Sequence, residues 1–140
     1  MSGVVLDASV VAAWYLRGQS TTGADQLLQD APDLQFAVPH IFPSELANFL
    51  LVAERDRRIT ATRSREILDD LSGYEVSVAE APSISEVGAL LALARNEGLS
   101  AYDATYLDLA AREGLVLASR DGALLRAAGR RGVQVRDVRR

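Results

Sequence analysis

The sequence GVVLDAS, residues 3–9, decides how the rest of the chain is organised. Three apolar residues at 4–6 run into Asp7, and Ser9 follows two positions later. A short apolar run that ends in polar residues is typical of a buried strand. We therefore expect a strand that ends in a carboxylate and turns directly into a helix.

Short β-branched segments alternate with longer helical patterns along the rest of the chain. The expected strands lie at 4–6, 36–38, 75–78, 115–118 and 133–135, and the expected helices at 8–17, 22–29, 44–58, 62–71, 84–97, 101–113 and 123–131. This alternation predicts one α/β domain over residues 1–140, with a mainly parallel sheet of about five strands.

Composition excludes several kinds of chemistry. The chain has no cysteine and no lysine, and His40 is its one histidine. Disulfides, thiolate metal sites, lysine-dependent phosphate loops and two-histidine nucleases are therefore excluded. No apolar run approaches the ~18 residues that span a membrane, and no export signal precedes the first strand. We expect a cytoplasmic protein that does not enter the membrane.

The charge is unevenly distributed. The net charge is −4, yet seven of the 21 residues from 120 onward are arginines. An overall negative charge is a poor indication of nucleic-acid binding. The arginine-rich end is either a solvated surface or a local basic patch, and the sequence leaves both readings open.

Four acidic residues occupy equivalent places near the starts of helices. Asp7 follows the first expected strand, Glu45 lies in the first turn of a helix, Asp103 lies in another, and Asp121 follows the fourth strand. Each alone has a structural explanation as a helix cap or turn residue. Together they favour a shared site, because ligands of parallel α/β sheets bind at the carboxyl ends of the strands.

If the four carboxylates meet, a cation has to offset their repulsion. Two unit charges 4 Å apart repel by about 4 kcal/mol at an effective dielectric constant near 20. An all-oxygen set of ligands selects a hard ion, Mg²⁺ or Mn²⁺. Such an ion activates water and stabilises a leaving oxygen, which suits hydrolysis of phosphodiester bonds.

The chain resembles PIN-domain ribonucleases of the VapC toxin type. The matching segments are LDAS at 6–9, PSELANFL at 43–50, YDATYLDLA at 102–110 and LASRDGALLRAA at 117–128. Their order and spacing agree over essentially the whole chain. One departure is Ser119, which stands where threonine is more frequent and keeps the hydroxyl group.

The resemblance implies a PIN-like fold, with a five-stranded parallel sheet flanked by helices on both faces. It implies an Mg²⁺- or Mn²⁺-dependent endoribonuclease whose metal and catalytic residues are Asp7, Glu45, Asp103 and Asp121. Polar support is expected from Ser9, Asn48 and Ser119. A VapB-type antitoxin and a second copy of the chain are the expected protein partners, and RNA the expected substrate. The arginines expected to contact RNA are Arg17, Arg95, Arg120 and Arg126.

Other readings remain open from the sequence. A PIN-like module that binds RNA or protein without cutting is the main alternative. A receiver-type phosphoacceptor domain also has an acidic Mg²⁺ pocket, but it uses a lysine that this chain lacks. A dehalogenase-like phosphatase would need a second aspartate where Ser9 stands.

Overall fold

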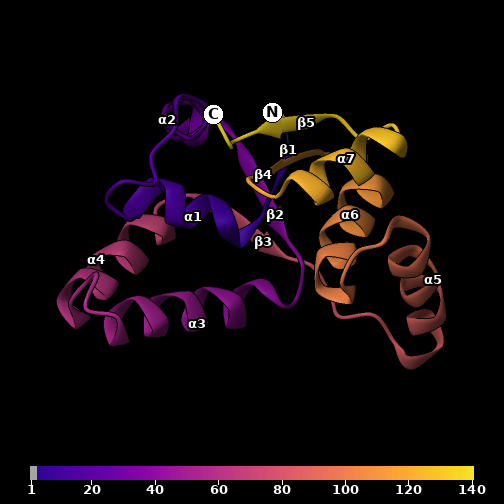
Figure 1. The fold of residues 1–140 in the computed structure, drawn as a ribbon, viewed down its shortest axis with the longest axis horizontal. Coiled ribbons are helices and arrows are strands. Elements are labelled where there is room, and N and C mark those ends of the chain that lie inside the picture. Colours follow the sequence, from indigo (N-terminus) through magenta and orange to yellow (C-terminus); the bar gives the residue numbers. More distant parts are fainter. Residues whose placement is uncertain (1–2) are drawn as a thin grey trace.

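The computed structural model describes residues 3–140 and contains a five-stranded parallel sheet between two groups of helices (Figure 1). The strands are β1 Gly3–Leu6, β2 Gln35–Val38, β3 Glu75–Val78, β4 Val116–Ser119 and β5 Val135–Asp137. The helices are α1 Ala8–Tyr15, α2 Thr22–Asp30, α3 Phe42–Arg55, α4 Ala61–Ser72, α5 Val87–Glu97, α6 Ala101–Glu113 and α7 Gly122–Arg130, and short 3₁₀ turns lie at Ala31–Asp33 (η1) and Ile84–Glu86 (η2).

The sheet has the strand order β3-β2-β1-β4-β5, so the first strand lies at its centre. Val5 lies opposite Ala37 on one side and opposite Leu117 on the other. All four strand pairs are parallel. The carboxyl ends of all strands therefore meet at one edge, and the strand order changes direction beside β1, where a ligand of such a sheet is expected.

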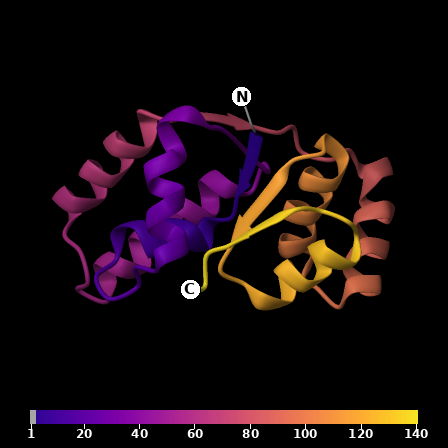
Figure 2. The ribbon, with the colours of Figure 1, turned by 90° about the horizontal axis from the view of Figure 1, so that it is seen from above.

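Helices cover both faces of the sheet. Figure 2 shows α1 to α4 on one side and α5 to α7 on the other, with α5 packed outside α6. Both layers bury apolar side chains against the strands, including Val10 on α1 and Leu107 on α6. The three apolar residues of GVVLDAS, Val4 to Leu6, are at most 2% exposed. The parallel sheet, its number of strands and the helices on both faces confirm the expected fold class.

Local sequence explains where the helices begin and end. Thr21, Thr60 and Ser100 cap the N-termini of α2, α4 and α6 with their hydroxyl groups. Gly98 and Gly114 end α5 and α6 with φ angles of 65°, a left-handed conformation that glycine adopts without steric cost. Within residues 3–140, none of the helices is long and apolar enough to cross a membrane.

The last strand differs from its prediction. It was expected at 133–135 and lies at Val135–Asp137. The backbone N–H of Val133 donates to the carbonyl of Ala128 and so closes the end of α7, while Gly132 has a φ of 73°. Residues 131–134 therefore form the turn that ends α7, and β5 begins later than the β-branched residues at 133 and 135 suggested.

Candidate active site

Asp7 lies at the end of the central strand, almost completely buried. Its side chain is 7% exposed, and its Oδ2 accepts hydrogen bonds from the hydroxyl groups of Ser119 at 2.6 Å and Ser9 at 2.9 Å. Burial raises the pKa of Asp7, and the hydrogen bonds from the two serines offset part of that rise. The nearby charge of Asp121 raises the pKa further. The structure thus places Ser9 and Ser119 where polar support was expected.

Ser119 joins the turns after two neighbouring strands. Its fully buried hydroxyl group donates to Asp7 and accepts the backbone N–H of Asp121 at 2.9 Å. In the same turn, the backbone N–H of Arg120 donates to Oγ of Ser9 at 3.1 Å. Asp7 and Asp121 are therefore held by one hydrogen-bond network, although 114 positions separate them in the sequence.

Asp121 also begins the last helix. Its Oδ1 accepts the backbone N–H groups of Ala123 and Leu124 at 2.9 and 3.3 Å. The residue is thus a helix cap, which was its alternative explanation, and at the same time a member of the acidic group. The two roles use different features of one residue: the cap fixes Oδ1, and the position after β4 brings the carboxylate to the edge of the sheet.

Glu45 is held by a tyrosine from a distant helix. It lies in the first turn of α3, and the hydroxyl group of Tyr106 on α6 donates to its Oε1. Burial raises the pKa of Glu45, the hydrogen bond from Tyr106 lowers it, and the charge of Asp7 raises it. Burial and the contact with Glu45 raise the pKa of the Tyr106 phenol, so it remains a donor at neutral pH.

The pKa of Asp103 is raised by burial and by the charges of all three other acids. Asp103 lies in the first turn of α6, where its backbone N–H donates to the side chain of Ser100. Burial raises its pKa to about 6, together with the charges of Asp121, Asp7 and Glu45 in decreasing order. The charges of Asp7, Glu45 and Asp121 therefore all act on Asp103.

The donor chemistry of this acidic group fits a hard divalent cation. The side chains offer only oxygen, which is the donor preferred by Mg²⁺ and Mn²⁺. A cation among them would also offset the mutual repulsion that raises the pKa of Asp103. Within residues 3–140, no three histidine, aspartate or glutamate side chains lie close enough together to form a ready-made metal site.

The remaining residues expected at the site are spread around it. Asn48 lies one turn beyond Glu45 on α3, is exposed, and makes no side-chain hydrogen bond in the described part of the chain. Arg120 lies between Ser119 and Asp121, and its Nη1 donates to the side chain of Gln19 at 2.7 Å. The other three expected arginines are exposed: Arg17 follows α1, Arg95 lies in the last turn of α5, and Arg126 lies on α7.

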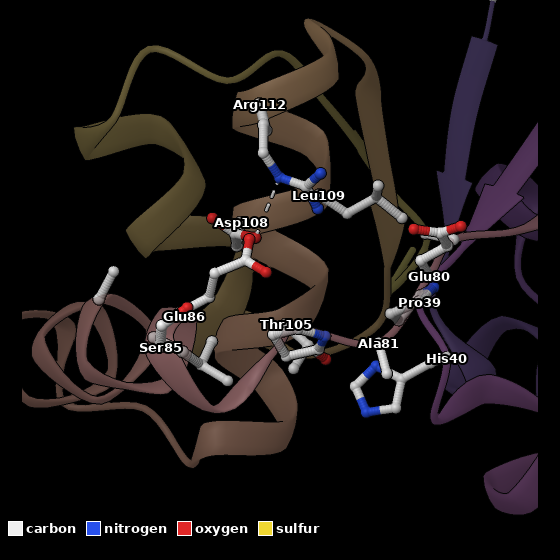
Figure 3. A pocket seen from close by; sticks show the side chains of 14 residues that line it. Pro39, His40, Glu80, Ala81, Ser85, Glu86, Thr105, Asp108, Leu109 and Arg112 are labelled. Carbon is white, nitrogen blue, oxygen red and sulfur yellow. Dashed lines mark hydrogen bonds and ion pairs between the residues drawn. The ribbon is translucent and has the colours of Figure 1, made fainter.

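A separate pocket of about 470 Å³ lies between α6, the start of α5 and the segments that follow β2 and β3, and none of the four acids lines it. Figure 3 shows His40 from the end of β2, Glu80 from the end of β3, and Thr105, Asp108 and Arg112 from α6 around this pocket. Asp108 accepts a hydrogen bond from Arg112 at 3.3 Å. Asp108 thus lies toward this pocket, five residues and about 140° around the helix from Asp103 at 3.6 residues per turn.

The fold and the acidic edge define the class of protein as an α/β domain with a carboxylate site at the switch point of a parallel sheet. The sequence matches the PIN domain family over residues 4–130, and the chain belongs to that family. PIN domains are generally nucleases. No curated protein matches the sequence.

Solved structures with the same fold cover nearly the whole chain. PAE2754 from Pyrobaculum aerophilum is 27% identical with a TM-score of 0.70, over 96% of this chain and 89% of the other. VapBC2 from Rickettsia felis, bound to a DNA fragment from its promoter, is 16% identical with a TM-score of 0.66, over 96% and 98%. FitAcB from Neisseria gonorrhoeae is 17% identical with a TM-score of 0.63, over 94% and 95%.

Sequence reasoning missed one residue of the site. The helical spacing of Tyr106 predicts packing within the helix layer or at an interface between copies. Tyr106 is completely buried, so packing is confirmed, but its hydroxyl group reaches Glu45 across 61 positions of sequence. Its spacing from Asp103 places it on the same face of the helix, because residues three apart lie on one face, but the local sequence does not indicate its partner on α3.

Proposed function

We propose that this protein is a divalent-metal-dependent endoribonuclease and the toxin of a VapBC-type toxin–antitoxin pair. The observation that carries the proposal is the position of four acids in the first turns or caps of α1, α3, α6 and α7 of a PIN domain, where burial and the charges of the other three acids raise the pKa of Asp103. A site that gathers negative charge at the switch point of the sheet is suited to a cation and a phosphate ester rather than to an anion alone.

Asp7, Glu45, Asp103 and Asp121 would hold Mg²⁺ or Mn²⁺. When bound, the ion supplies an activated water and stabilises the charge on the leaving oxygen. The serine hydroxyl groups of Ser9 and Ser119 fix the orientation of the Asp7 carboxylate.

Tyr106 acts in the same way on Glu45. Its donated hydrogen bond keeps one oxygen of Glu45 in place on the α6 side. The bond leaves Oε2 of Glu45 available for the cation. The side chains thus orient the acids, and none of them serves as a covalent nucleophile.

The test is a cleavage assay on mixed cellular RNA with antitoxin-free protein. Wild type should cut with Mn²⁺ and remain inactive with EDTA, and Asp103→Asn should abolish cleavage without unfolding the protein. Asp108→Asn is the matched control, because it makes the same change on the same helix but on the face turned to the separate pocket. Normal cleavage by Asp103→Asn would show that the site is wrongly assigned.

Folded wild type that binds RNA but leaves it uncut with Mn²⁺ would favour the alternative, a catalytically silent RNA- or protein-binding module. Calorimetric titration with Mn²⁺ then separates an intact metal site with an absent RNA target from a chain that binds no metal. Only the second result removes the nuclease proposal altogether.

We also propose that the protein forms a homodimer and binds a VapB-type antitoxin. Support for the antitoxin comes from the structural similarity to VapBC2 and FitAcB. Support for the dimer comes from apolar side chains exposed on two sides. Leu51 and Leu68 are 44% and 45% exposed on α3 and α4, while Ile84 and Tyr102 are 90% and 65% exposed near α5 and α6. Light scattering of the toxin alone and with its antitoxin tests both; a monomer at micromolar concentration would contradict the dimer.

A further inference from the structure

Two arginine side chains converge beside the candidate active site. A Cβ atom added at Gly122 would lie 2.9 Å from Nη1 of Arg139 and 3.0 Å from Nη1 of Arg126. Both nitrogens thus lie close to one point above the first residue of α7, directly after Asp121. The missing side chain of Gly122 leaves the space that the two guanidinium groups occupy.

One of the two cations has an acidic partner, and the other has none within residues 3–140. Arg139 donates from Nε and Nη2 to Asp137, which leaves Nη1, the atom nearest Gly122, outside that ion pair. Arg126 makes no ion pair within residues 3–140. At the other end of α7, by contrast, Arg130 and Arg131 both bind Glu97. Arg126, in the middle of α7, therefore has no acidic partner within residues 3–140, and its guanidinium group reaches back to Gly122, next to Asp121.

The backbone holds Arg139 in this place. The N–H of Val138 donates to the carbonyl of Ser119 at 2.9 Å, and the side chain of Val138 is fully buried. On the other side, the N–H of Gly23 donates to the carbonyl of Arg140 at 2.7 Å. Arg139 is thus anchored through both neighbours, one of them bonded to the serine that orients Asp7.

The helix terminus itself does not supply the free donors. The backbone N–H groups of Ala123 and Leu124 are already bonded to Asp121. The available donors are the guanidinium N–H groups, and guanidinium forms strong, geometrically matched hydrogen bonds with phosphate oxygens.

We propose that Arg126 and Arg139 form a clamp for one backbone phosphate of RNA next to the scissile one. This inference rests on the proposed nuclease function and adds the subsite that holds the chain beyond the cut. A phosphodiester carries one charge and two free oxygens, one for each guanidinium group. The clamp relieves the repulsion between the two cations and leaves the acids free for the metal.

Gly122→Ala is the discriminating variant. Its methyl group displaces the flexible ends of both arginines and touches no backbone atom, so the fold is retained and the clamp is disrupted. Gly129→Ala is the matched control, because it adds the same methyl group to the same helix where nothing lies within 4 Å. The double variant Arg126→Ala/Arg139→Ala should reproduce the effect of Gly122→Ala.

The measurement is the affinity for a fluorescein-labelled random single-stranded RNA, in EDTA to prevent cleavage, at several salt concentrations. We expect Gly122→Ala and the double variant to bind about tenfold more weakly, as for removal of hydrogen bonds to a charged group. The double variant should also lower the slope of log affinity against log salt by about 0.7 for each phosphate that it no longer neutralises. With Mn²⁺, KM should rise while kcat and calorimetric Mn²⁺ affinity stay near wild type.

Results that contradict the clamp can be told apart from results that contradict the proposed nuclease function. Gly122→Ala and double-variant proteins that bind and cut RNA as wild type does would overturn the clamp and leave the nuclease intact. The same variants are also titrated with a poly-glutamate peptide. If they lose affinity for this peptide but not for RNA, the arginines belong to a site for an acidic protein partner, and the clamp is overturned. Wild type that neither binds nor cuts RNA would overturn the proposed function, and the clamp with it.

Discussion

Replacing Asp103 by asparagine should stabilise the metal-free protein. In the folded chain the pKa of Asp103 is raised to about 6 from an ordinary 3.8. The folded state therefore holds a proton that the unfolded state has already lost between these pH values. Stability falls as pH rises through this window, and the whole penalty is present above pH 6. Asparagine removes the charge and with it the penalty.

The size of the effect follows from the shift. A change of about two pKa units corresponds to about 3 kcal/mol at ~1.4 kcal/mol per unit. Because the carboxylate is only partly buried, screening by water reduces this to about 1–2 kcal/mol. Asp103→Asn should therefore raise the free energy of unfolding by that amount at pH 7.5, with no difference from wild type near pH 3.5.

Urea unfolding followed by circular dichroism, in EDTA at pH values from 3.5 to 8, measures this difference. Asp108→Asn is the control; it removes a surface ion pair with Arg112 and should change stability by less than about 1 kcal/mol, in the destabilising direction. An Asp103→Asn variant that is equally or less stable than wild type at pH 7.5 would refute the reasoning. Excess Mn²⁺ should stabilise wild type more than the variant.

Three further substitutions test single contacts. Ser119→Ala should cost about 2–4 kcal/mol in urea unfolding, because Asp7 loses its shorter hydrogen bond in a buried place. Tyr106→Phe should cost about 1–2 kcal/mol and weaken calorimetric Mn²⁺ affinity about tenfold, because Glu45 loses its donor. Gly23→Ala should cost at least about 1–3 kcal/mol by thermal unfolding, because its methyl group would meet two backbone carbonyl oxygens at 2.7 and 2.8 Å.

Each of these has a matched control. Ser72→Ala removes an exposed hydroxyl group bonded only within its own helix, Tyr102→Phe changes an exposed tyrosine on α6, and Gly129→Ala adds a methyl group in open space. All three should stay within about 0.5 kcal/mol of wild type. A test variant that unfolds like its control would show that the contact it removes contributes nothing to stability.

The sequence predicted the features that depend on local pattern. The buried run before Asp7 and the ends of α5 and α6 lie where they were expected, and the S-x-x-D cap at Ser100 and the glycines at 98 and 114 explain those helix boundaries. These features depend on periodicity and on the conformations that single residues allow, so neighbours in sequence contain the information.

What the sequence could not predict depends on contacts between distant segments. A buried tyrosine at helical spacing reads as packing, and nothing local indicates that the hydroxyl of Tyr106 finds Glu45. Arg139 read as part of a charged tail, because its contact with Gly122 exists only once β5 lies beside β4. The late start of β5 also depends on a contact outside the strand, because the backbone N–H of Val133 bonds to Ala128 at the end of α7 and not to a neighbouring strand.

The position of β1 beside β4 has a consequence for synthesis on the ribosome. Residues 4–6 emerge more than 100 residues before residues 116–118, which form one of their two neighbouring strands. A nascent chain that ends before β4 lacks Ser119 and Asp121, and its Asp7 has no serine from that strand to hold it. The acidic group is thus assembled only after β4 and the turn into α7 have been made, and a product truncated before that turn cannot contain it.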